Sequence, residues 1–229
     1  MRAARMYLTD SSPDVPQIDW STSMALSRTD ISDGLVDELR GFESLVRSLS
    51  QAELDSPSRC AGWTVGDVAR HVIGSMADVT AGRLEGLGTP EVTAREVAER
   101  ADRSAANLAD ECAQVATAAA GLLQVFDDTT WNAPPPGGFD GTLGQGVEAL
   151  WYDTWLHADD IRSALGRPSE VGNGMSCALS HVETALSKHA WTGAVPAVDD
   201  PNAFAFVLAA TGRGSGDALG PNAPIDIYA

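Results

Sequence analysis

The chain is poor in lysine, in basic residues generally and in long apolar runs. Lys188 is the only lysine, and 15 basic residues stand against 32 acidic ones, which gives a formal net charge of −17. Such a charge disfavours a nucleic-acid backbone or an anionic membrane surface as a partner, because both repel an acidic protein. No run of 18 apolar residues occurs, so we expect no membrane-spanning helix and a small molecule as the partner.

Cysteine is also scarce. Cys60, Cys112 and Cys177 are odd in number and far apart, and they form no Cys-x-x-Cys pair. This pattern is typical of reduced thiols rather than of a disulfide framework. The N-terminus carries Arg2 and Arg5 but lacks the apolar segment of a secretory signal. We therefore expect a cytoplasmic protein.

The N-terminal segment shows no helical periodicity, which begins only near residue 30. We interpret residues 1–28 as a flexible leader. Either Met1 or Met24 fits as the native start.

Apolar residues recur every three or four positions over most of the remaining chain, as they do in amphipathic helices. Helices are expected over residues 32–50, 64–84, 90–126 (with a break near 103–104), 143–165 and 175–189, with a linker at 53–61 and a Pro- and Gly-rich loop at 127–141. Four long amphipathic helices joined by mostly polar connections predict an antiparallel bundle.

The start of the second helix is the clearest local signal in the sequence. Thr64 is placed as the N-cap and Asp67 follows three residues later, which is the pattern of a capping box. Trp63 and Val68 flank this pair at the spacing of a hydrophobic staple.

The chain divides into a bundle domain over residues 29–168 and a C-terminal extension over residues 169–229. In the extension, Asp200 as N-cap and Pro201 at the first helical position predict a further helix. Residues 225–228 are apolar enough for one short strand. Sixty residues make a thin independent domain, so we expect the extension to pack on the bundle.

Three side chains of the bundle could hold a divalent metal. Asp153 and His157 lie four residues apart, about 40° from one another on an ideal helix and on one flank of its apolar stripe. His71 flanks the stripe of the second helix. Three such ligands suffice for a cation that keeps a position open for chemistry. From spacing alone, two ordinary half-buried histidines and a surface carboxylate remain the alternative, because Asp/His pairs at this spacing are common.

The surrounding sequence carries a family resemblance. The stretch Cys60–His71, with Gly62-Trp63-Thr64-Val65 and Asp67, resembles the N-terminal domain of the mycothiol-dependent maleylpyruvate isomerase family. That family belongs to the DinB-like metalloprotein superfamily. The likeness continues in residues 153–166 and in the tail Phe206-Val207-Leu208, Thr211-Gly212-Arg213 and Ile227-Tyr228, and so covers residues 30–229. It implies an all-α, DinB-like four-helix bundle with a small, mostly helical C-terminal extension.

The resemblance also implies a ligand set. Family members bind a divalent metal, commonly zinc, through a histidine at the place of His71 and a Glu-x3-His pair at the place of Asp153 and His157. Aspartate is one methylene shorter than glutamate, so its oxygen retreats by about 1.5 Å if the backbone stays in place. Metal–oxygen distances tolerate only tenths of an ångström. Either the helix shifts, or a water intervenes, or the metal differs or is lost.

The implied activity is that of a metal-dependent enzyme using mycothiol, a small thiol of actinobacteria. The metal would bind the thiol cofactor's sulfur and lower its pKa, and the thiolate would add to a small electrophilic substrate. Departure of the sulfur after bond rotation gives cis–trans isomerisation, as in a maleylpyruvate isomerase, whereas retention gives a thiol S-transferase. Arg162, Arg167 and Arg213 are candidates for binding an anionic substrate.

Two other functions remain open. One is a non-catalytic DinB-like protein that binds a metal or a partner. The other is a thiol-independent biosynthetic enzyme on the same scaffold. A monomer and a homodimer both fit the sequence.

Several further residues have two interpretations. Asp160 could orient a ligating imidazole, but we favour a solvated acid beside Asp159. Cys60 precedes a helix N-terminus, where a thiolate is stabilised, yet a packing role is favoured because the family takes its thiol from a cofactor. We expect His181 and His189 to be structural or exposed rather than ligands.

Overall fold

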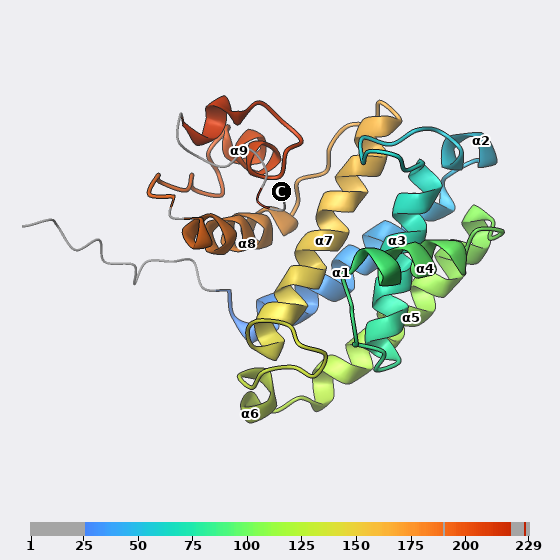
Figure 1. Ribbon diagram of the computed structural model, residues 1–229, viewed down its shortest axis with the longest axis horizontal. Helices are drawn as coiled ribbons and strands as arrows, with labels where there is room; N and C mark the ends of the chain where they lie inside the picture. The colour runs from blue at the N-terminus through green and yellow to red at the C-terminus, as the bar shows by residue number, and fades with distance from the viewer. Residues whose placement is uncertain (1–25, 190, 221–226, 228–229) are drawn as a thin grey trace, which may run out of the picture.

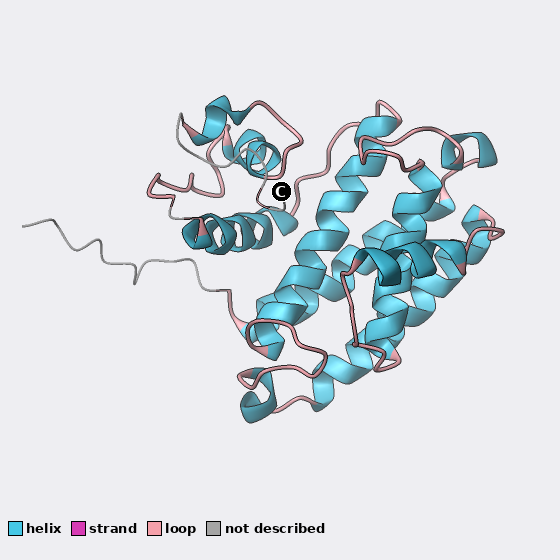
Figure 2. Ribbon diagram, in the orientation of Figure 1, coloured by secondary structure: helices cyan, strands magenta, loops and turns pink. Residues whose placement is uncertain are grey.

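The structure is a computed structural model that describes residues 26–189, 191–220 and 227. The helices, in chain order, are α1 (Arg28–Arg47), α2 (Gln51–Leu54), α3 (Val65–Thr80), α4 (Pro90–Ala98), α5 (Ala105–Val125), α6 (Asp128–Trp131), α7 (Leu143–Ala164), α8 (Gly174–Lys188), α9 (Ala203–Ala210) and the 3-10 helix η2 (Gly216–Leu219). Figure 2 shows only helices and loops in this part of the chain.

The four long helices α1, α3, α5 and α7 form the expected bundle. Each of α1 and α3 packs against both α5 and α7, so α1 lies diagonally across from α3. The shorter helix α4 packs on α3, and α8 packs on α7 at the other side of the molecule (Figure 1). Among the described residues, no helix is both long and apolar enough to cross a membrane.

Local capping signals set the start of several helices. At α3, the Thr64 hydroxyl accepts from the Asp67 amide at 3.1 Å, and the Asp67 carboxylate accepts from the Thr64 amide at 3.0 Å. This confirms the predicted capping box. The helix ends at Thr80 rather than at residue 84, because Gly82 follows with a φ of 74°, a conformation that terminates helices.

The same kind of signal explains where the other helix boundaries differ from expectation. The pair Ser27 and Asp30 forms a capping box that starts α1 four residues earlier than predicted. A second box, made by Ser50 and Glu53, starts the short helix α2 inside the expected linker. The predicted break in the third long helix is confirmed, since α4 ends at Ala98 and Ser104 caps α5.

The predicted cap of the last helix was wrong. α9 begins at Ala203, and Asp200 instead accepts from the amide of Asn202 at 2.7 Å in the turn before it. Residues 1–25 of the expected leader lie outside the described residues. Arg28, the last residue of that expected segment, is instead the first residue of α1. The expected C-terminal strand also lies outside them except for Ile227, whose amide donates to the carbonyl of Ala210 at 2.9 Å.

The apolar core has two parts that meet on α7. One fills part of the bundle and includes Phe42, Val68 and Ile161. The other fills the remaining part of the bundle, continues into the C-terminal helices and includes Trp155 and Phe206. Helix α7 therefore has apolar neighbours on two sides, which holds its polar residues in fixed positions.

Candidate metal centre

Helices α3 and α7 bring the three predicted ligands together. Nε2 of His157 lies 3.5 Å from Oδ1 of Asp153, and Nε2 of His71 lies 3.8 Å from Oδ2 of the same carboxylate. One ligand atom from each residue lies within 4.8 Å of the others. The two imidazoles meet edge to face, with their centroids 5.4 Å apart. A single carboxylate thus faces a histidine from each of two helices.

These separations suit a small divalent cation. Zinc–nitrogen and zinc–oxygen bonds of about 2.0–2.1 Å in a tetrahedron place neighbouring ligand atoms about 3.3 Å apart. The observed 3.5 and 3.8 Å exceed that spacing by only tenths of an ångström. Asp153 therefore reaches both imidazoles despite its short side chain, and its 38% exposed side chain leaves the centre open to solvent.

Each imidazole is oriented from behind by a buried carboxylate. Nδ1 of His71 lies 3.0 Å from Oε2 of Glu96, and Nδ1 of His157 lies 2.8 Å from Oδ2 of Asp160. Glu96 is 1% exposed and Asp160 is fully buried. With Nδ1 engaged in this way, both rings turn Nε2 toward Asp153. The interpretation of Asp160 as a solvated acid was wrong, because α7 buries it between the bundle and the C-terminal residues.

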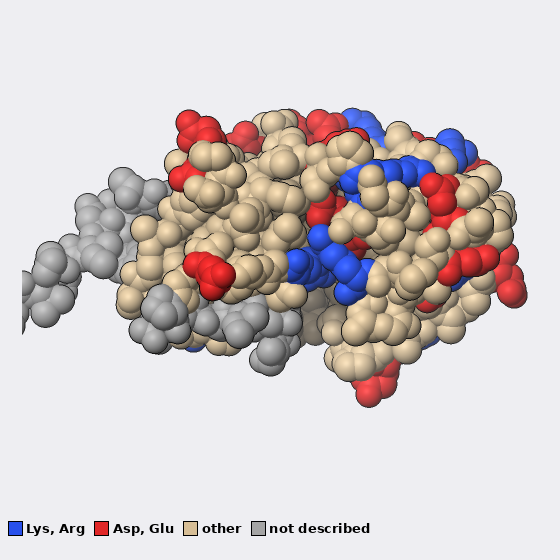
Figure 3. Space-filling view, turned by 90° about the horizontal axis from the view of Figure 1, so that it is seen from above, with Lys and Arg blue, Asp and Glu red and all other residues tan. Residues whose placement is uncertain are grey.

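Arginines from outside α7 neutralise the acid behind His157. Arg213 donates to Asp160 through Nε at 2.8 Å and Nη2 at 2.9 Å, and Arg59 donates to both Asp160 and Asp159. Burial alone would raise the pKa of Asp160, but the hydrogen bonds from His157 and Arg213 hold it well below its usual range. Basic side chains lie where the C-terminal helices meet the bundle on the face in Figure 3.

The charge around His157 favours a positive group. Burial would lower the pKa of this imidazole, but the charge of Asp153 and the hydrogen bonds to Asp160 and Cys60 raise it to about 10. These surroundings stabilise a proton on His157 and would equally stabilise a metal cation in its place.

A second group of potential ligands shares His157. Cys60, His157 and Asp160 each offer an atom within 4.8 Å of the others, and the Cys60 thiol lies 3.2 Å from Oδ2 of Asp160. Two guanidinium groups, from Arg59 and Arg213, already hold this carboxylate. A cation would meet their repulsion, so this group acts as a hydrogen-bonded support for His157.

The two groups of potential metal ligands differ in the balance of charge around them. Asp159 and Asp160 carry two negative charges that Arg59 and Arg213 balance. Glu96 and Asp153 have no such arginine, and Oε1 of Glu96 is buried without a hydrogen-bond partner among the described residues. With both imidazoles neutral, Glu96 and Asp153 leave two negative charges beside the proposed ligands, which one divalent cation would balance.

The three arginines proposed for substrate binding have different surroundings. Arg162 pairs with Glu170 at 2.6 Å, and Arg167 pairs with Glu53 at 2.7 Å. Only Arg213 lies beside the metal-ligand candidates, through Asp160. Of the histidines outside the site, His189 is exposed, whereas His181 stacks on Tyr152 with centroids 4.1 Å apart.

Sequence reasoning missed two residues of the site. Arg59 directly precedes the motif that begins at Cys60, and that adjacency was the one available signal. Glu96 lies in the expected third helix, where nothing in its spacing relates it to His71. It reaches the site because α4 turns back across α3 (Figure 1).

Comparison with known proteins agrees with this architecture. Residues 35–162, more than half of the chain, match the family described as the mycothiol maleylpyruvate isomerase N-terminal domain. A crystal structure of the mycothiol-dependent maleylpyruvate isomerase superposes with a TM-score of 0.59 at 16% identity, and a point mutant of that enzyme does so at 15% identity. Each alignment covers 87% of this chain and 97% of the other. No curated protein matches the sequence. The fold is thus the DinB-like bundle expected above, and the chain belongs to the mycothiol maleylpyruvate isomerase N-terminal domain family.

Proposed function

We propose that this protein is a metal-dependent enzyme that uses mycothiol to act on a small electrophilic substrate, with His71, Asp153 and His157 as metal ligands. The observation that carries the proposal is the meeting of two imidazole nitrogens and one carboxylate at near-ligand spacing. A divalent cation, zinc by its preference for this donor set, would act there as a Lewis acid that lowers the pKa of a thiol.

The residues of the chain supply binding and orientation. Asp160 and Glu96 hold the two imidazoles, and the open side of Asp153 leaves room for thiol and substrate. Arg213 is the arginine best placed to attract an anionic substrate, although its guanidinium is shared with Asp160. This supports a substrate with a carboxylate next to a conjugated double bond, as in the relatives' named activity.

The reaction that fits is addition and release of a thiol. When bound, mycothiol would supply a sulfur nucleophile for reversible addition to a conjugated double bond; rotation about the resulting single bond and cleavage of the new carbon–sulfur bond would return the isomer and the thiol. If that bond persists, the product is a thioether and the protein is an S-transferase. Three free thiols in the described chain also support a reducing, cytoplasmic setting.

Metal content and thiol dependence test the proposal. Wild type should carry about one zinc per chain, and His71→Ala and Asp153→Ala should lose it, while Asp153→Glu should keep it because a carboxylate still faces both imidazoles. Asp159→Asn is the matched control, since this acid pairs with Arg59 and not with the ligands. Activity is measured on maleylpyruvate and a panel of electrophiles, with and without mycothiol.

Three results would count against the proposal. Full metal occupancy in both alanine variants would remove the site. Turnover that does not depend on any thiol would favour a biosynthetic enzyme on this scaffold. A metal-loaded protein without turnover would favour a binding protein.

A further inference from the structure

The most informative group outside the three proposed ligands is Glu96, whose role rests on the metal site proposed above. Its carboxylate is 1% exposed and comes from α4, the short helix that crosses α3. Oε2 lies 3.0 Å from Nδ1 of His71, while Nε2 of the same ring faces Asp153 at 3.8 Å. The two nitrogens of one imidazole therefore have carboxylates on opposite sides.

This arrangement selects one form of the ring. A carboxylate accepts a hydrogen bond and cannot donate one. Glu96, at 3.0 Å from Nδ1, is within hydrogen-bond distance of the ring, whereas Asp153, at 3.8 Å from Nε2, is not, so the hydrogen of a neutral His71 belongs on Nδ1. Nε2 then carries the lone pair and points it toward Asp153 and His157. We propose that Glu96 is a positioning residue that fixes His71 in the Nδ1–H tautomer and thereby presents Nε2 as a metal ligand.

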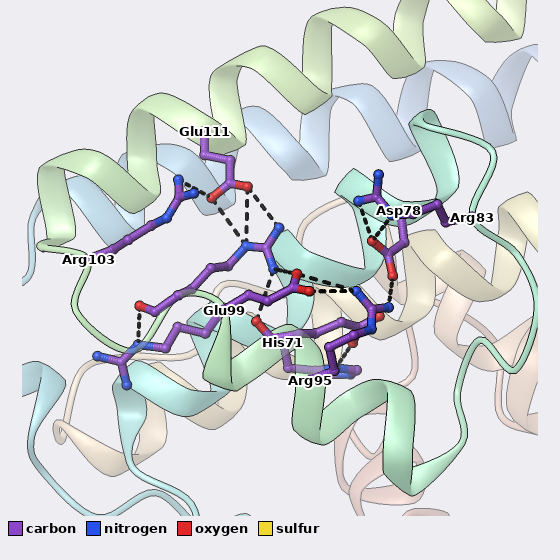
Figure 4. Close-up of polar contacts among 10 residues, drawn as sticks. His71, Asp78, Arg83, Arg95, Glu99, Arg103 and Glu111 are labelled. Carbon is purple, nitrogen blue, oxygen red and sulfur yellow. Dashed lines mark hydrogen bonds and ion pairs between the residues drawn. The ribbon is translucent and has the colours of Figure 1, made fainter.

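Several ion pairs and hydrogen bonds hold the helix that carries Glu96 in place. At one side of α4, Arg95 pairs with the buried Asp78 of α3. At its other end, Arg100 donates to Glu111 of α5 at 2.8 Å and to the Glu96 carbonyl at 3.0 Å. Figure 4 shows Asp78 with Arg95, and Glu111 with its own polar contacts. These interactions tie α4 to both α3 and α5.

A glycine allows the close approach of α4 to α3. A Cβ at Gly74 would lie 2.6 Å from Cβ of Glu96 and 2.9 Å from Nη1 of Arg100, both closer than real contacts. Gly74 stands one turn after His71, on the same face of α3. The absence of a side chain there brings the carboxylate within hydrogen-bond distance of the imidazole.

The unbalanced charge of Glu96 sets it apart from Asp160. Asp160 orients His157 in the same way, but Arg59 and Arg213 neutralise it. Glu96 has no arginine on its carboxylate, and its Oε1 lacks a partner among the described residues. A buried charge is costly when it is not compensated, and a cation bound to His71 would compensate it through the ring.

The test compares Glu96→Ala and Glu96→Gln with Glu99→Gln, an exposed acid that follows α4 and pairs with Arg95. The first measurement is the tautomer of His71 in metal-free protein by nitrogen–proton NMR, which four histidines keep assignable. The second is zinc affinity by chelator competition. We expect Nδ1–H in wild type and a tautomer mixture in Glu96→Ala. Zinc affinity should fall about 10- to 100-fold in Glu96→Ala and by less in Glu96→Gln, and change less than about twofold in Glu99→Gln.

The outcomes distinguish this inference from the proposed function. Unchanged zinc affinity in Glu96→Ala and Glu96→Gln would overturn the inference, whatever the tautomer. Should wild type bind no zinc, the metal site would fail, and the tautomer in Glu96→Ala alone would decide the role of Glu96. A ring that keeps Nδ1–H in Glu96→Ala would then overturn it. If Glu96→Ala does not fold, Glu96→Met, which fills the space and has no oxygen to accept the hydrogen bond, carries both measurements.

Discussion

Neutralising Asp160 should destabilise the metal-free protein strongly. This carboxylate is fully buried and accepts hydrogen bonds from Arg59, from Nε and Nη2 of Arg213, from Nδ1 of His157 and from the Cys60 thiol. In its absence, His157 still faces the carboxylate of Asp153. In Asp160→Asn, Arg59 keeps Asp159 as its anion. Arg213, whose side chain is 16% exposed, keeps only the carbonyl of Thr211 among the described residues.

The magnitude follows from that inventory. One guanidinium loses its anion in a mostly buried place, and breaking such a pair from one side costs about 3–5 kcal/mol. Because Arg213 retains a little solvent contact, we expect the lower end, about 3 kcal/mol. With a urea m-value of about 2 kcal/mol/M, the unfolding midpoint should move down by about 1.5 M. Asp159→Asn should cost less, because Arg59 then still has Asp160.

A double-mutant cycle isolates the pair. Urea unfolding is followed in excess chelator for wild type, Asp160→Asn, Arg213→Met and the double variant. The double variant should lose at least about 1 kcal/mol less than the two single variants lose together, because it contains no unpaired buried charge. Additive losses, or a loss below about 1 kcal/mol in Asp160→Asn, would show that this ion pair does not hold the C-terminal residues to α7.

Two further predictions concern α1. Burial raises the pKa of Glu38 to about 7. The stability that protonation of Glu38 contributes is therefore fully present below pH 4.5 and is lost as the pH rises through 7. Glu38→Gln should therefore match wild type near pH 4.5 and exceed it by up to about 3 kcal/mol above pH 7, as measured by urea unfolding across pH; a pH-independent difference would contradict this. A Cβ at Gly34 would lie 2.3 Å from the buried Trp151 ring, so Gly34→Ala should lose about 1–3 kcal/mol, whereas the unobstructed Gly41→Ala should gain about 0.5–1 kcal/mol. Equal thermal shifts in the two alanine variants would refute the packing argument.

Local chemistry made part of the structure predictable. Thr64 and Asp67 specify the start of α3 by hydrogen bonds within four residues, so the sequence alone predicted the N-terminus of that helix correctly. The spacing of Asp153 and His157 likewise put them on one flank of α7, because helical geometry is the same everywhere.

The residues that support the site required the tertiary structure. Asp160 and Asp159 read alike in the sequence, and both are buried because segments distant in the chain supply Arg59 and Arg213. Glu96 becomes important only because α4 folds back onto α3. Burial of a charge depends on partners that no local pattern encodes, and it is the property that sequence periodicity predicts least well.

The convergence of α3 and α7 on Asp153 has a consequence for folding. A cation held by His71 and His157 would act as a cross-link that closes a loop of more than eighty residues, including all of α4 and α5. In the chain-entropy view, a link across a loop of that length destabilises the unfolded chain by about 4.5 kcal/mol, as a disulfide would. Unlike a disulfide, it forms reversibly with the supply of metal. The free energy of unfolding of the protein would thus depend on the free metal concentration around it.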